Sequence, residues 1–371
     1  MKKIVYLFLI GLFMFSFSGM AIAKPVSWQN QNVYKGFNFS PDMDFGAGKY
    51  AIASYDENRK MEMVSLINAN GTVYNGNIDV SLGASNPSDP DVSWNGTTFG
   101  VFWFDSWRVY YASVHPDGYL VTNPVMVYEG AVHVSATWNK KSQEYGVVFW
   151  GGNDWNPAGA RFLRVDQYGR VLAPEVALNS VNGGGYYRPR IATDGSGFGV
   201  TWSDMRTCDG TCREVAFAYV SKDGYKVGGD VILTSTGAEH VNDIVWNGEE
   251  FAMVTYGNNG VSMVRVDKGG NLLQFSSLTG DPPYSNNMRL SWDKNHYLLT
   301  TIGYTNKTDI DILLYKYDRF GKIIGSPTDI SESTTIDYYP SNAVVSGNSI
   351  AVAWVGDLWG QDQGILFVSG K

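Results

Sequence analysis

The 371-residue sequence has little of what most enzymes and metalloproteins use. It contains two cysteines and four histidines, and the histidines form no His-x-His or His-Glu-x-x-His pattern. It also lacks a Gly-x-Ser-x-Gly phrase, a phosphate-binding glycine loop and an Asp-x-Asp-x-Asp-Gly calcium loop. We therefore expect no cofactor, no metal and no known catalytic signature.

Basic side chains and long apolar runs are also scarce. The chain has 28 Lys and Arg against 36 Asp and Glu, a formal net charge of −8, and its cations form no stripe. Nucleic acid is therefore excluded as an expected partner. The only long apolar run, residues 4–17, is shorter than the roughly 20 residues that span a bilayer, so no stable membrane anchor is expected.

That apolar run instead has the form of a secretory signal peptide. Lys2 and Lys3 precede it, and Ala21-Ile22-Ala23 follows it as a small-residue cleavage site. We predict a signal peptide over residues 1–23 and a mature chain, 24–371, that is secreted by a bacterium into the periplasm or the medium. No cysteine follows the cleavage site, which argues against a lipid anchor.

The two cysteines, Cys208 and Cys212, share one loop. In an oxidising compartment they should form a disulfide that orders this loop, since a three-residue spacer closes too small a ring to stabilise the whole fold much. A free or redox-active pair and a metal site are the alternatives.

What the chain does have is a repeat of about fifty residues. Each unit ends in an apolar strand, a polar turn and a glycine, and these glycines lie 46–55 residues apart, at Gly71, Gly118, Gly169, Gly224, Gly270 and Gly321. Asn-Gly and Asp-Gly hairpins and period-two apolar strands fill each unit. A period of this length built from strand signals predicts a β-propeller with four-stranded blades.

Counting the second strand of each unit gives seven blades, with six or eight as alternatives. The last unit ends at residues 368–371 without a fourth strand, whereas residues 25–34 have the form of a fourth strand without the three before it. We therefore predict an all-β, seven-bladed propeller, a single domain over 24–371, closed by the N-terminal strand completing the last blade. Closure also pairs the edges that an open array exposes. We expect a monomer.

One repeat carries a resemblance. Residues 91–103, Asp-Val-Ser-Trp-Asn-Gly-Thr-Thr-Phe-Gly-Val-Phe-Trp, resemble the repeats of uncharacterised secreted bacterial β-propeller proteins. The likeness is one of repeat style over most of the mature chain. It implies the fold and export, and it assigns no residue roles.

The candidate site is the face where the loops after second strands meet the loops that lead into first strands. These loops are long and rich in aromatic and acidic residues, which suits a glycan or a protein partner. We predict a non-catalytic binding module. The alternatives are a hydrolase or lyase that uses loop carboxylates and a structural protein of envelope assembly. The candidate ligand-binding residues are Asp105, Trp107, Trp155, Tyr187, Asp204, Arg206, Tyr284, Asp337, Tyr338 and Trp359.

Overall fold

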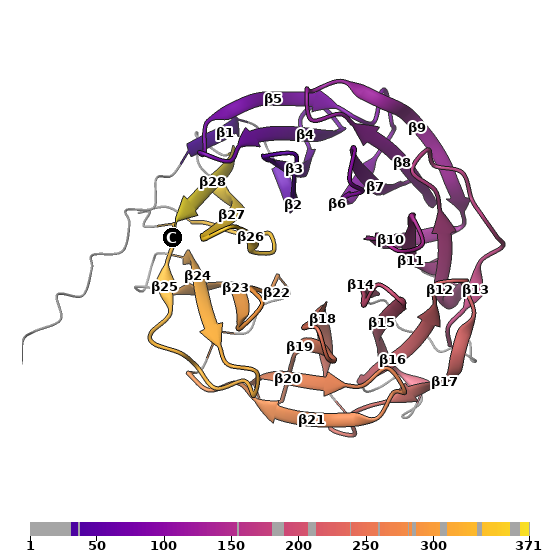
Figure 1. The fold of residues 1–371 in the computed structure, drawn as a ribbon. Helices are drawn as coiled ribbons and strands as arrows, with labels where there is room; N and C mark the ends of the chain where they lie inside the picture. The colour runs from indigo at the N-terminus through magenta and orange to yellow at the C-terminus, as the bar shows by residue number, and fades with distance from the viewer. Residues whose placement is uncertain are drawn as a thin grey trace, which may run out of the picture.

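The fold is a closed ring of seven four-stranded antiparallel sheets (Figure 1). The computed structural model describes residues 31–35, 38–153, 156–179, 189–206, 213–237, 239–258, 260–280, 282–283, 287–304, 310–331, 336–356 and 364–370. This part of the chain contains no α-helix, and therefore no helix of a length and hydrophobicity that could cross a membrane. The seven-bladed all-β prediction is confirmed.

Blades 1 to 6 each use four strands in chain order, from the central channel outward. Blades 1 to 3 consist of β2 (Asn38–Gly46), β3 (Lys49–Asp56), β4 (Met61–Asn68) and β5 (Val73–Asp79); β6 (Pro87–Trp94), β7 (Phe99–Asp105), β8 (Arg108–Val114) and β9 (Leu120–Glu129); and β10 (Ala131–Asn139), β11 (Glu144–Asn153), β12 (Asn156–Val165) and β13 (Val176–Ala177). Blades 4 to 6 consist of β14 (Arg190–Thr193), β15 (Gly197–Asp204), β16 (Glu214–Ser221) and β17 (Lys226–Ile232); β18 (His240–Trp246), β19 (Phe251–Gly257), β20 (Gly260–Val266) and β21 (Leu272–Ser277); and β22 (Arg289–Trp292), β23 (Tyr297–Tyr304), β24 (Ile310–Tyr317) and β25 (Thr328–Asp329).

Blade 7 combines the two ends of the chain. Its inner strands are β26 (Val344–Ser346), β27 (Ser349–Gly356) and β28 (Gly364–Gly370), and β1 (Gln31–Lys35) pairs antiparallel with β28 as the outer strand. Val33 of β1 is buried in the same cluster as Ile365 and Phe367. The predicted closure by the N-terminal strand is therefore confirmed, because the strand joins the last blade through backbone pairing and through apolar packing.

The phrase Trp-x-Gly-x-x-Phe is explained by packing within the first hairpins of blades 2 and 5. Trp94 lies on Phe99 with 4.7 Å between ring centroids, and Trp246 on Phe251 with 4.8 Å. The glycine after the second aromatic leaves room for the next blade: a Cβ at Gly199 would lie 2.6 Å from the Phe251 ring. Aromatic rings thus join adjacent blades where the sequence places glycine opposite them.

The glycines that mark the repeat sit in the turns between third and fourth strands. All six have left-handed φ values of 80–89°, which only glycine adopts without strain. Asp166 shows the accompanying turn chemistry, because its carboxylate accepts the backbone N–H groups of Tyr168 and Arg170 at 2.8 and 2.9 Å. The phrase Asp166-Gln167-Tyr168-Gly169 is therefore a tight turn.

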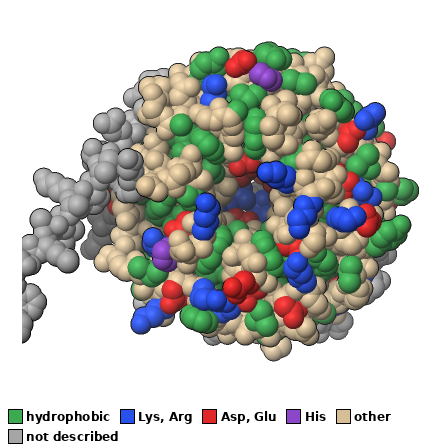
Figure 2. All heavy atoms as spheres, in the orientation of Figure 1, with side chains coloured by type: hydrophobic (Ala, Val, Ile, Leu, Met, Phe, Trp, Pro, Cys, Tyr) green, Lys and Arg blue, Asp and Glu red, His purple; other side chains and the backbone are tan. Residues whose placement is uncertain are grey.

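The ring has two different faces. The turn face carries the connections from first to second and from third to fourth strands, such as residues 47–48 and 69–72, and the loop face carries the remaining connections, such as residues 80–86. Figure 2 looks onto the turn face and shows the central opening with Lys and Arg side chains gathered around it. The opening leads into a channel of about 420 Å³ lined by the first strands of all seven blades.

Candidate functional site

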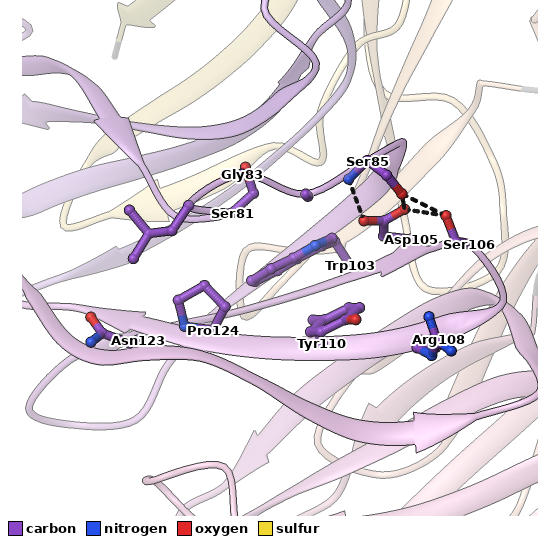
Figure 3. Close-up of a pocket in the computed structure, with 12 residues that line it drawn as sticks. Ser81, Gly83, Ser85, Trp103, Asp105, Ser106, Arg108, Tyr110, Asn123 and Pro124 are labelled. Carbon is purple, nitrogen blue, oxygen red and sulfur yellow. Dashed lines mark hydrogen bonds between the residues drawn. The ribbon is translucent and has the colours of Figure 1, made fainter.

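A pocket of about 510 Å³ opens between blades 1 and 2 on the loop-face side (Figure 3). The segment from Ser81 to Ser85, which links β5 to β6, lies over one side of it, and β7, β8 and β9 supply the other. The indole of Trp103 and the ring of Tyr110 lie nearly parallel, 16° apart, with centroids separated by 5.8 Å. The pocket therefore has a flat aromatic wall beneath a polar loop.

Asp105, a predicted site residue, holds this loop in place. Its carboxylate accepts hydrogen bonds from the Ser85 backbone N–H at 2.8 Å, the Ser85 hydroxyl at 2.9 Å, the Asn86 backbone N–H at 2.9 Å and the Ser106 hydroxyl at 2.7 Å. Burial raises the pKa of Asp105, but these hydrogen bonds outweigh burial and hold the pKa below its ordinary value. Asp105 is thus an ionised latch between two blades and a wall of the pocket.

Trp107, also predicted, lies beside this pocket at the tip of the β7–β8 hairpin. Ser106 and Trp107 both have left-handed φ values, 52° and 69°, which is the pattern of a type I′ turn. The Trp107 carbonyl accepts the backbone N–H groups of Gly130 and Ala131 at 2.7 and 3.0 Å, so the neighbouring loop supports the turn. The side chain stays 41% exposed. The structure therefore brings Asp105 and Trp107 together, as their sequence adjacency requires.

Asp204 and Arg206 form a separate group in blade 4. The Asp204 carboxylate accepts the Trp202 indole N–H at 2.8 Å and is paired with the Arg206 guanidinium at 2.6 Å, and Arg206 also contacts Asp230. Burial raises the pKa of Asp204, but the bonds from Arg206 and Trp202 outweigh it and hold the pKa below its ordinary value. Because the charges of Asp204, Arg206 and Asp230 are paired with one another, we interpret these residues as a structural network.

Asp337 and Tyr338 lie against blade 7. The Asp337 backbone N–H donates to the Ile310 carbonyl at 2.8 Å, and the Asp337 side chain is fully buried. Tyr338 forms an isolated bridge with Val355 and packs against the blade 1–blade 7 core. Asp105, Asp204 and Asp337 therefore occupy three different regions of the ring, and the structure does not gather them into one site.

The remaining predicted residues lie outside the described part of the chain. These are Trp155, Tyr187, Tyr284 and Trp359, together with the predicted disulfide partners Cys208 and Cys212. Their assignments stay predictions. Among the residues that the structure does describe, no group of three His, Cys, Asp or Glu side chains is placed to hold a metal ion.

Sequence reasoning missed a set of charged side chains in the channel. Asp42 and Asp44 of β2, Asp91 of β6 and Asp243 of β18 line the channel together with Arg289 of β22. A signal for them was present: Asp42 and Asp91 occupy the same repeat position, next to an apolar residue on a first strand. Charged residues on the inward side of an innermost strand indicate a polar channel rather than a packed core.

Comparisons with known proteins support the architecture alone. No family model matches the chain, and no curated protein sequence matches it. Among solved structures, the β-propeller domain of the Trilobed protease from Pyrococcus furiosus is similar at a TM-score of 0.54 and 12% identity, over 90% of this chain and 95% of that one. BBS1N, solved in complex with ARL6DN, is similar at a TM-score of 0.55 and 10% identity, over 94% and 97% of the two chains. At these identities the likeness establishes a shared β-propeller fold.

Proposed function

We propose that this protein is a non-catalytic binding module that holds a glycan or a protein partner on its loop face, with the pocket between blades 1 and 2 as a ligand site. The observation that carries the proposal is the preformed pocket itself. Its loop is fixed by three hydrogen bonds, from Ser85 and Asn86 to Asp105, before any ligand arrives. Preformed concave sites with an apolar wall and a few polar groups are typical of ligand binding.

The surface around this pocket supports the same proposal. Leu82 is 54% exposed and Trp107 is 41% exposed, so each can lose apolar area to a partner. Arg108 at the rim is half-buried and pairs with Glu129 at 2.9 Å. Aromatic and arginine side chains around a pocket are the residues that contribute most to binding interfaces. BBS1N, a propeller that was solved with a protein bound, is consistent with a protein partner at the level of the fold.

The loop carboxylates favour binding over hydrolysis. A general acid needs a raised pKa and a position beside a second carboxylate. Asp105 and Asp204 have lowered pKa values, and hydrogen bonds from neighbouring protein groups occupy both of them. The hydrolase alternative therefore has no support from these two residues. A role in envelope assembly stays an alternative, for which a binding partner would be a protein of the envelope.

The test compares the full mature chain with a Leu82→Ser, Trp107→Ala double variant on glycan and peptide arrays. The matched control is Tyr225→Ala, which removes an aromatic ring that is 74% exposed at a turn of the opposite face. We expect saturable binding that weakens about tenfold or more in the double variant and is unchanged in the control. Equal binding by all three proteins, or no binding to either array, contradicts the proposed site.

We also propose that the chain acts outside the cytoplasm, as the first 23 residues suggest. The support for this is the sequence pattern of the leader, two lysines before an apolar run and a small-residue cleavage site.

A further inference from the structure

The loop-face end of the central channel brings together charged side chains from several blades. Ser40, Asp89, His133, Arg190 and Arg289 line a small cavity of about 10 Å³, and Arg289 also lines the main channel of about 420 Å³. These residues come from the beginnings of the first strands or bulges near them, in blades 1, 2, 3, 4 and 6. The cavity has room for about one water molecule, while the channel beside it has room for a small ligand.

The fold itself uses several of these charges. Asp42 accepts the backbone N–H of Val92 at 2.8 Å, and Asp243 accepts that of Leu290 at 2.9 Å. The Arg190 side chain donates to the Asn242 carbonyl at 3.1 Å. Each bond joins the first strand of one blade to that of a neighbouring blade. They supply partners for backbone groups at the inner edge of the sheet, which no further strand covers.

Arg289 is different. Within the described ranges its guanidinium makes no hydrogen bond and no ion pair, although it is half-buried and lines both cavities. It interacts with the carboxylates of Asp42 and Asp91 through longer-range electrostatic attraction. A guanidinium offers five N–H donors in a planar fork, and a channel wall leaves them available to a ligand.

The neighbouring acids do not cancel this charge at every pH. Burial raises the pKa of Asp91 well above its ordinary value, Asp42 raises it further, and Arg190 and Arg289 oppose them. Burial also raises the pKa of Asp42, against the opposing effect of Arg289. The other titratable groups that line the channel and its small cavity are Asp44, Asp89, His133 and Asp243. Once Asp91 is protonated, the two guanidinium groups face fewer negative charges.

We propose that this end of the channel binds the carboxylate group of a small ligand, with Arg289 as the contact. Arg289 has no hydrogen bond or ion pair within the described chain, and the two oxygens of a carboxylate match its guanidinium fork. A dianion such as phosphate fits less well, because Asp42, Asp89 and Asp243 lie near the same place. The site is separate from the pocket between blades 1 and 2, so the two proposals fail independently.

The experiment is isothermal titration calorimetry of the mature chain with glucuronate and with trialanine. The matched neutral probes are glucose and trialanine amide. We expect saturable binding of the two carboxylates and none of the neutral probes. Affinity should be higher at about pH 5 than at about pH 7.5, because a lower pH favours the neutral forms of Asp42, Asp44 and Asp91, whose pKa values burial raises, while the ligand stays ionised.

Variants locate the site. Arg289→Gln should weaken carboxylate binding about tenfold or more, Arg289→Lys should retain part of it, and Asp91→Asn should reduce the pH dependence. Arg319→Gln is the matched control, because Arg319 lies on the turn face and pairs with the exposed Glu249 at 2.7 Å. Circular dichroism confirms that each variant folds. The proposal is overturned if no carboxylate binds at either pH, if phosphate alone binds, or if Arg289→Gln binds as tightly as Arg319→Gln.

Discussion

At the scale of the residue, the phrase Trp-x-Asp at the end of a second strand has different hydrogen-bond partners in blades 2 and 4. Trp202 and Asp204 are joined by an indole hydrogen bond of 2.8 Å. Trp103 and Asp105 have the same spacing, but Asp105 bonds the Ser85 segment instead, and the Trp103 indole N–H has no acceptor within the described chain. The Asp105 carboxylate thus fixes the loop over the pocket, and the Trp103 indole N–H is left without an acceptor in the described chain.

Asp105→Ala tests this latch. The substitution removes four hydrogen bonds and leaves the Ser85 and Asn86 N–H groups without their acceptor. We expect the free energy of unfolding to fall by about 2–3 kcal/mol. Urea denaturation followed by tryptophan fluorescence measures the loss. The control is Asp117→Ala, since the Asp117 side chain is 62% exposed and should change stability by less than about 0.5 kcal/mol. Equal midpoints for the two variants rule out the latch.

Asp44 predicts a pH effect. Burial raises its pKa to about 6, above the unfolded value of about 4, so the folded state binds up to about one extra proton between these values. The contribution of Asp44 to stability is therefore greatest at low pH and is lost as the pH rises from about 4 to about 6.

Asp44→Asn isolates that contribution. The amide oxygen can still accept the Trp94 backbone N–H, which lies 2.6 Å from the Asp44 carboxylate. Urea unfolding across this pH window should show the wild type losing stability relative to the variant, and above about pH 7 the difference should be constant. A difference that stays flat across the whole range shows that Asp44 ionises as an ordinary carboxylate.

The sequence predicted where Asp105 and Trp107 lie more readily than it predicted what each candidate side chain contacts. The sequence placed Asp105 and Trp107 together on the loop face, and the structure keeps them there beside a pocket. Sequence could not tell that Asp105 serves backbone N–H groups of the preceding loop, because that depends on which way the side chain turns at the end of β7. Nor could it separate Asp204, which is saturated by Arg206, from a carboxylate available to a ligand.

At the scale of the element, β1 decides whether the ring is closed. β1 and β28 lie at opposite ends of the chain, so their pairing carries a large loop-closure cost. Apolar contact between Val33, Ile365 and Phe367 offsets part of that cost. Without β1, the edge of β28 would be open to pairing with another chain.

Val33→Asp tests the closure. The side chain is 7% exposed, so a carboxylate there loses its water without gaining a partner. We expect a loss of about 2–4 kcal/mol and increased light scattering on mild heating. Val121→Asp on β9 is the matched control, because Val121 is 46% exposed and a carboxylate there stays hydrated. If both variants unfold at the same urea concentration, β1 does not stabilise the ring.

At the scale of the whole molecule, the repeated strands form the scaffold, and the candidate sites lie on the loop-face side and in the channel. Aromatic rings pack against glycines of the preceding blade at Gly100, Gly146 and Gly199, whereas the channel lining differs from blade to blade. A rigid ring thereby presents two independent candidate sites, one between blades 1 and 2 and one at the end of the channel.

Export is a prediction about the whole chain. Expression of residues 1–371 in a bacterium should yield a mature protein outside the cytoplasm whose first residue is Lys24. Mass spectrometry of the intact protein reads the cleavage site. Thiol labelling before and after reduction shows whether Cys208 and Cys212 are paired. An uncleaved chain in the cytoplasm contradicts the secretory prediction, and the Lys2→Glu, Lys3→Glu variant should export less in a matched experiment.

The sequence by itself determined the architecture, because each blade is built from short-range signals. Period-two strands, Asn-Gly and Asp-Gly turns and the repeated glycine all act within about fifty residues, and seven copies add up to a ring. Only the tertiary structure decided where charges meet. Asp42, Asp91, Arg190 and Arg289 come from four blades and are brought to one channel by ring closure. The physical reason is that local pattern fixes a strand and its register, whereas neighbours across the ring depend on how all seven blades pack.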